Sequence, residues 1–204
     1  MSKTIQLNNQ LLRRYLQSLG YSVPDAQLHL IGIRGAVPTG PDTLQLVENV
    51  PNRYNDSIGT FGTHLQMFRG SVDPGATWTE NPSNPNGCAH LLNGAWRYRR
   101  GLHRGKPALV QAAPVKVWRD KDKDYARDPH EMVDTGWFGI NGHAGGSAPT
   151  VDANSAGCQV TAGGWTGKPW TTYRDLVYAA PQELFWYFLV DGSDLAKFAE
   201  KGVA

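Results

Sequence analysis

The chain has 204 residues, including 23 glycines and 13 prolines, so it is long enough to bury a hydrophobic core and rich in residues that punctuate short elements. The formal net charge of +2 gives no support for nucleic-acid binding, which requires a concentrated basic surface. No segment approaches the about 18 apolar residues of a membrane-spanning helix. The first residues form no apolar run of signal-peptide type, so we expect synthesis in the cytoplasm without export by that route.

The N-terminal part predicts one helix followed by short strands. Residues 4–19 carry apolar side chains at helical spacing, with Thr4 or Asn8 as the N-cap and Gly20 after the last turn. Apolar or alternating runs then predict strands within residues 28–37, 42–50 and 57–68.

The C-terminal part predicts a long loop, a hairpin, a short strand and two helices. Glycine and proline punctuate residues 69–88, which we expect to form a loop. Residues 95–102 and 107–120 predict a hairpin with the HRGK segment near its turn. A short apolar run predicts a strand at residues 137–140. Residues 182–201 predict two helices, the first over about residues 182–189 with Pro181 in its first turn.

These elements predict one α+β, mostly β domain over residues 1–204. Strands fill the middle of the chain, and helices lie near both termini. The chain shows no internal repeat and no low-complexity linker, so we expect no domain boundary.

Residues 139–160 are the strongest candidate for a reactive site. They hold His143 and Cys158 among glycine, alanine, serine and asparagine, which leave room for a substrate. A cysteine attacks as the thiolate and needs an adjacent base or a lowered pKa. The spacing of 15 positions allows a strand, a turn and a return strand that place the two side chains together. The backbone N–H groups of Gly157, Cys158 and Gln159 are candidate donors to an oxyanion.

Three structural alternatives account for the same residues. Cys158 can be a buried apolar thiol and His143 a hydrogen-bonded loop histidine. Cys88 and Cys158 can form a disulfide, although free thiols are expected in a cytoplasm. A zinc site that adds His90 is disfavoured, because the single residue between Cys88 and His90 is not a usual spacing of zinc ligands.

Two other chemistries are rejected from the sequence. The aspartates within residues 120–128 suggest a calcium loop. Lysine and tyrosine lie between them, however, and we expect neither a glycine nor a closing glutamate where such loops need one. A glycosidase needs an acidic pair across a cleft, and no glutamate lies in a segment that supports such a pair. We therefore predict no metal and no cofactor.

The segment that holds His143 resembles the catalytic segment of the L,D-transpeptidase (YkuD-type) family. That family carries a histidine followed by a Ser/Thr-His-Gly-Cys signature, and here His143 precedes SAGC at residues 155–158. The match covers residues 137–160. With its flanking pattern, over about residues 31–160, the chain resembles a divergent branch found among small phage and prophage proteins.

The resemblance implies a β-rich, sandwich-like domain with the cysteine at a strand end beside a cleft. It implies that Cys158 is a nucleophile that forms a thioester with a peptidoglycan stem peptide, and that His143 is its base. Ser155 would shape the pocket. The backbone N–H groups of Gly157 and Cys158 would contribute to the oxyanion site.

The sequence departs from the family pattern at three positions. Ala156 replaces the second histidine, and Gln159 replaces an apolar residue. Val160 replaces the arginine or asparagine that would contact a substrate carboxylate. The nucleophile and its base are retained, so cysteine acyl chemistry is still expected.

Three further residues are weaker candidates for contacts with the substrate. Arg34 follows a buried strand and either holds a carboxylate or forms a structural salt bridge. His103, in the HRGK segment, faces either the same cleft or solvent. Trp137 flanks the motif and either lines a peptide groove or packs in the core.

Two functions from different classes follow. We expect a peptidoglycan-acting cysteine acyltransferase or peptidase, whose partner is the stem peptide. Because the similar proteins belong to phages and no signal peptide is present, we expect a lysis protein, an endolysin, that reaches the cell wall once the membrane is breached. The alternative is a catalytically inactive wall-binding or phage structural module on the same fold, favoured by the loss of the second histidine.

Overall fold

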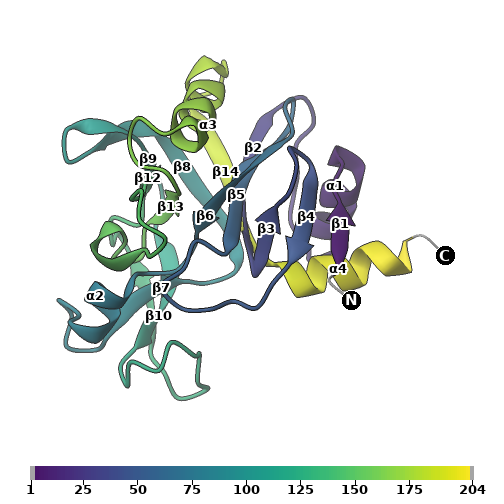
Figure 1. Ribbon diagram of the computed structural model, residues 1–204. Helices are drawn as coiled ribbons and strands as arrows, with labels where there is room; N and C mark the ends of the chain where they lie inside the picture. Colours follow the sequence, from purple (N-terminus) through teal and green to yellow (C-terminus); the bar gives the residue numbers. More distant parts are fainter. Residues whose placement is uncertain (1–2, 203–204) are drawn as a thin grey trace.

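The computed structural model describes residues 3–202, and a closed β-barrel forms its centre (Figure 1). The barrel strands are β2 (Leu28–Arg34), β5 (Asp56–Gly62), β6 (Gln66–Ser71), β8 (Gly94–His103), β9 (Lys106–Gln111), β12 (Gly142–Ala144), β13 (Gln159–Thr161) and β14 (Leu184–Asp191). Around the barrel they follow the order β12-β13-β6-β5-β2-β14-β8-β9. The pair of Gly142 with Leu109, between β12 and β9, closes the ring.

The predicted mostly β class with some helix is confirmed, because 38% of the described residues are in strands and 20% are helical. Where the resemblance implies two packed sheets, one sheet closes on itself instead. Strand β14 pairs with β2 on one side and with β8 on the other, so the end of the chain lies in the wall of the barrel. Closure leaves the barrel without the free edges that a sandwich has.

Two small sheets and the helices surround the barrel. One sheet has the order β1 (Thr4–Gln6), β4 (Thr43–Leu46), β3 (Ala36–Pro38), and the other has the order β11 (Val133–Gly136), β10 (Val115–Asp120), β7 (Cys88–Leu91). The helices are α1 (Asn9–Ser18), α2 (Ala76–Glu80), α3 (Lys168–Ala179) and α4 (Gly192–Lys201), with a 3-10 turn at Asp152–Asn154. In Figure 1, α1 and α4 lie beside the β1-β4-β3 sheet, and α2, β7 and β10 lie on the opposite side of the barrel. Within residues 3–202, no helix has the length and apolar character needed to cross a membrane.

Two hydrophobic clusters cover the two faces of β2 and β14. Leu30 of β2 and Phe185 and Tyr187 of β14 belong to one cluster. Ile31 and Phe188 belong to the other, which also holds apolar side chains of α1 and α4. Because neighbouring residues of a strand point to opposite faces, both faces of these strands are buried. Such strands have continuous apolar sequences rather than alternating ones.

The predicted N-terminal helix over residues 4–19 is wrong at its start. Thr4–Gln6 form β1 and pair with β4, which buries the apolar residue between two polar ones. Helix α1 begins only at Asn9. The Asn8 side chain accepts a hydrogen bond of 2.8 Å from the backbone N–H of Leu11, so Asn8 is the N-cap.

The predicted helix over about residues 182–189 is also wrong, because residues 184–191 form the strand β14. Its LFWYFLV sequence is aromatic and branched, which suits a strand that is packed on both faces. Helix α3 precedes it instead, with Pro169 in the first turn. The last predicted helix is present as α4, which begins after Asp191.

Two smaller differences lie near the candidate site. Residues 137–140 form no strand, because the strand that pairs with β10 is β11, which ends at Gly136. The predicted loop over residues 69–88 includes the end of β6 and helix α2. Trp78 of α2 donates a hydrogen bond of 3.0 Å to the carbonyl of Ala153, which ties this helix to the 3-10 turn.

The aromatic core of β14 gives a stability prediction. Phe188 is fully buried, and its ring centroid lies 5.9 Å from those of His29 and Phe61. Phe188→Ala should lower the free energy of unfolding by about 3–5 kcal/mol, because it leaves a cavity in the core. Urea unfolding measures the change, with Leu102→Ala, at a position that is 67% exposed, as the control. Equal small losses in both variants would contradict the burial of Phe188.

Candidate active site

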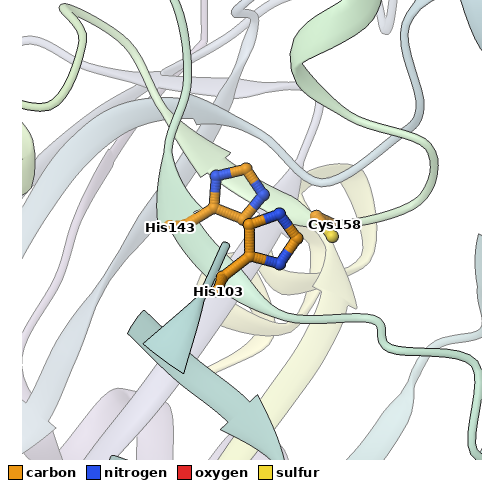
Figure 2. Close-up of side chains that lie close together, drawn as sticks. All are labelled: His103, His143 and Cys158. Atoms are coloured by element: carbon orange, nitrogen blue, oxygen red, sulfur yellow. The ribbon is translucent and has the colours of Figure 1, made fainter. Parts of the chain in front are cut away.

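The parallel pair β12–β13 brings His143 and Cys158 to the same place. His143 lies in β12, opposite Val160 of β13, and Cys158 directly precedes β13. His103, the last residue of β8, meets them from the hairpin between β8 and β9. A ring nitrogen of each histidine and the Cys158 sulfur lie within 4.8 Å of one another (Figure 2).

A two-residue turn positions the side chains of this hairpin. Arg104 has a φ of 51° and Gly105 a φ of 77°, the two left-handed conformations of a type I′ turn. Glycine adopts such a φ without steric cost, which is why the HRGK sequence turns at this point. His103 pairs with Lys106 across the turn, so the hairpin brings one histidine and two cationic side chains to the site.

His103, His143 and Cys158 open onto a cleft of about 280 Å³. The cleft is also lined by Trp78, Arg104, Lys106, Ala144, Ala153, Asn154, Ala156 and Trp165. None of these described lining residues is acidic, and two are cationic. The cleft therefore favours a ligand with an anionic group.

His143 is held as a neutral base. Its Nδ1 donates a hydrogen bond of 2.8 Å to the Ala144 carbonyl, which leaves Nε2 free to accept a proton. The ring stacks on His103, at a centroid distance of 4.3 Å, and on Trp165, at 5.6 Å. Burial lowers the pKa of His143 to about 4, helped by the charge of Arg104 and opposed by the Ala144 hydrogen bond. At neutral pH the imidazole is therefore uncharged and able to take a proton from a thiol.

Cys158 rests as a thiol rather than as a thiolate. The residue is 7% exposed, and its Sγ accepts a hydrogen bond of 3.5 Å from the Asn141 N–H and donates one of 3.4 Å to the Gly139 carbonyl. Burial raises the pKa of the thiol to about 11, against the effects of the Asn141 N–H and the Arg104 charge. Attack by Cys158 thus needs a base that takes the proton during the step, and His143 is placed to do so.

Two of the three candidate oxyanion donors are already occupied. The Gly157 N–H donates to Ser155 Oγ at 3.1 Å, and the Gln159 N–H donates to the Asn141 carbonyl at 2.8 Å. Within the part of the chain that the structure describes, the Cys158 N–H makes no such bond, so of the three candidates it alone has no hydrogen-bond partner. Ser155 Oγ also donates to the Cys158 carbonyl at 2.7 Å, so Ser155 shapes the loop that carries the cysteine.

The side chain of Gln159 has a structural role. It is 2% exposed, and its Nε2 donates to the carbonyls of Val72, at 3.2 Å, and Gly157, at 3.1 Å. Its Oε1 accepts a hydrogen bond of 2.7 Å from the Tyr187 hydroxyl. These bonds tie the loop of Cys158 to β14 and to the end of β6, which gives a physical reason for a polar residue after the cysteine.

Of the three weaker candidates, only His103 lines the cleft. Arg34 donates a hydrogen bond of 3.1 Å to Asp73 and lines a separate cavity. Trp137 is 64% exposed and is not among the residues that line the cleft. Arg34 therefore forms a structural salt bridge. Trp137 neither lines the cleft nor packs in the core.

Several cleft residues carry no signal in the sequence. Trp78 comes from α2 and Asn154 from the 3-10 turn, and the fold alone brings these segments beside Cys158. Arg104 and Lys106 come from the hairpin. Their position follows from the glycine of the HRGK turn once the two flanking strands are paired.

The disulfide and the four-ligand zinc site do not form. Cys88 and Cys158 are both free. His90 lies outside the cleft, with its ring nitrogens 3.8 Å from Asp73 and 3.7 Å from Asp120. The two cysteines therefore occupy different surroundings.

His103, His143 and Cys158 are residue types that bind zinc, but their arrangement does not suit a cation. The two imidazole rings are stacked within 14° of parallel, so their nitrogen lone pairs run side by side rather than converging. Two cationic side chains also line the cleft. The arrangement suits proton transfer between the side chains better than metal binding.

Comparison with known proteins identifies no relative. No family model, no curated protein and no solved structure matches this chain. The chemistry of the site is therefore inferred from its own geometry, beside the resemblance of residues 137–160.

The thiol state of Cys158 can be measured by alkylation with iodoacetamide. The rate should rise with pH and inflect near 11, because burial raises the pKa. Arg104→Gln should raise the inflection, since it removes a charge that favours the thiolate. Mass spectrometry of the modified peptides gives the rate, and Cys88, whose pKa burial also raises to about 11, serves as a control outside the cleft. An inflection below about 8 would instead indicate a thiolate–imidazolium pair.

Proposed function

We propose that the protein is a cysteine acyltransferase or peptidase that acts on peptidoglycan stem peptides, and that it serves a phage in lysis. The observation that carries the proposal is a buried thiol beside a neutral imidazole in the wall of a cleft. The resemblance of residues 137–160 to YkuD-type L,D-transpeptidases supports the same chemistry. On this proposal the barrel is a divergent form of that family's β-rich domain.

In the proposed reaction, Cys158 Sγ attacks a stem-peptide carbonyl while His143 Nε2 takes the thiol proton. The oxygen of the tetrahedral intermediate accepts a hydrogen bond from the Cys158 N–H. The C–N bond then breaks, His143 returns the proton to the leaving amine, and a thioester remains on Cys158. Water or an acceptor amine attacks the thioester, with His143 again taking the proton, and the sulfur leaves as the thiol.

The cationic rim of the cleft supports an acyl donor with a carboxylate near the scissile bond. Arg104 and Lys106 both line the cleft, and Lys106 Nζ lies 4.8 Å from the ring centroid of Trp165. In the family pattern, the residue at the position of Val160 makes the carboxylate contact. We infer that the hairpin turn supplies the positive charge in this chain.

One observation favours the second function, a wall-binding or structural module without catalysis. The thiol of Cys158 is buried and its pKa is raised to about 11, so the resting site holds no activated thiolate. Ala156 in place of the second histidine agrees with this alternative. The two functions make opposite predictions for the fate of a stem peptide.

Peptidoglycan fragments incubated with the purified protein distinguish the two functions. We expect a cut in the stem peptide, or a mass gain from a joined amine, when the products are analysed by mass spectrometry. Cys158→Ala should abolish both products, whereas Cys88→Ala, which removes a buried cysteine outside the cleft, should retain them. Unchanged fragments, together with binding to the wall, would favour the non-catalytic module.

The pH dependence of this reaction follows from the neutral pair. Protonated His143 cannot act as a base, and because its pKa is lowered to about 4, kcat/KM should fall only as the pH drops through about 4. The rate should be constant from there to the neutral range, since the thiol ionises only near 11. His143→Gln should lower kcat by about 10²–10⁴-fold. A midpoint near 6.5, the ordinary pKa of histidine, would contradict the burial of His143 as the cause.

A further inference from the structure

A second candidate site lies in the connection between β10 and β11. Residues 120–131 have the sequence DKDKDYARDPHE, with carboxylates at the first, third, fifth, ninth and twelfth positions. These are side-chain ligand positions of a twelve-residue calcium loop. Tyr125 stands at the sixth position, where such loops need glycine, and this residue argues against calcium in the sequence. The expectation that the loop lacks a closing glutamate is wrong, because Glu131 stands at the twelfth position.

The backbone at Tyr125 removes the objection. Tyr125 has a φ of 66°, the left-handed conformation for which these loops use glycine. Carboxylate oxygens of Asp120, Asp122 and Asp124 lie within 4.8 Å of one another. Carboxylates at this separation repel one another unless a cation lies between them.

The carboxylate of Glu131 closes back over the loop. It accepts hydrogen bonds from the backbone N–H groups of Lys121, at 3.3 Å, and Asp128, at 3.1 Å. The glutamate therefore faces the first part of the loop, as a closing ligand does.

A side chain outside the loop points to the same place. His90 of β7 is 2% exposed, and its Nε2 faces Asp120 at 3.7 Å from Oδ2 but has no hydrogen-bond partner among the described residues. A buried imidazole nitrogen is normally paired. The Asp120 carboxylate is held toward the loop instead, by the N–H groups of Lys123, at 2.8 Å, and Tyr125, at 3.2 Å. Asp120 is fully buried and its carboxylate is turned toward the loop, and buried carboxylates are typically hydrogen-bonded, paired with a positive group or bound to a metal.

The lysines between the aspartates leave the carboxylates accessible. Lys121 and Lys123 are both exposed. Lys123 Nζ donates a hydrogen bond of 2.8 Å to the Glu80 carbonyl at the end of α2, so its charge is directed away from the carboxylates. Neither lysine forms a salt bridge with a loop carboxylate among the described residues.

We propose that residues 120–131 bind one calcium ion. The ligands are the carboxylates of Asp120, Asp122, Asp124 and Glu131, the carbonyl of Ala126 at the seventh position, and Asp128 directly or through water. A set of oxygen donors favours calcium or magnesium over the transition metals. A flexible loop with a closing glutamate suits the larger coordination shell of calcium. The proposal is independent of the cysteine chemistry.

Isothermal titration of the metal-free full chain with calcium chloride tests the proposal. We expect one ion per chain, with a Kd of about 10⁻⁶–10⁻³ M. The melting temperature should rise with calcium concentration, because the ion binds only the folded loop. Magnesium should bind at least about ten-fold more weakly than calcium, since it demands a smaller and more rigid octahedral site.

Substitutions locate the ion. Glu131→Gln and Asp124→Asn should each weaken calcium binding by about ten-fold or more, whereas Glu183→Gln, an exposed glutamate outside the loop, should bind as the wild type does. Without calcium, both loop variants should melt at or slightly above the wild-type temperature, because they remove like-charge repulsion and no packing. Cys158→Ala should bind calcium unchanged. The absence of heat and of a melting shift up to about 10 mM calcium, or unchanged binding by Glu131→Gln, would overturn the proposal.

Discussion

The pairing of two three-residue parallel strands is the constraint on which the candidate active site depends. β12 and β13 are too short to be stable alone, and they hold together because β13 also pairs with β6 and β12 closes the barrel against β9. Their register places Cys158 level with Asn141, whose N–H contacts the sulfur. A shift of one residue would turn His143 to the opposite face of the sheet and remove the base from the cleft.

Burial then decides which atom carries the proton. The pKa of His143 is lowered to about 4 and that of Cys158 is raised to about 11, so the proton stays on sulfur until a substrate arrives. Arg104 favours the thiolate and disfavours the imidazolium. A substrate carboxylate paired with Arg104 would cancel that charge and raise the pKa of His143, which makes the imidazole a stronger base when a substrate is bound.

Local patterns in the sequence predict the features that depend on residues near one another along the chain. They miss the features that depend on closure of the barrel. The spacing of His143 and Cys158 and the glycine of the HRGK turn indicate two of the segments that form the cleft. Strand β14 is mistaken for a helix, because a strand buried on both faces loses its alternation and only its aromatic, branched composition remains as a signal. Trp78 and Asn154 reach the cleft only through the packing of α2 on the 3-10 turn, which no local pattern encodes.

Strand β7 connects the surroundings of Cys158 to the loop of residues 120–131. The Ala89 carbonyl lies so close to Gly157 that a β-carbon there would come within 2.5 Å of it, and Gly157 also has a φ of 123°, so this position requires glycine. The next residue, His90, faces Asp120 at the start of the loop. β7 therefore contacts the backbone before Cys158 through Ala89, and it faces Asp120, the first carboxylate of residues 120–131, through His90. Because Gly157 leaves no free space, β7 cannot move toward it without displacing the backbone that carries Cys158.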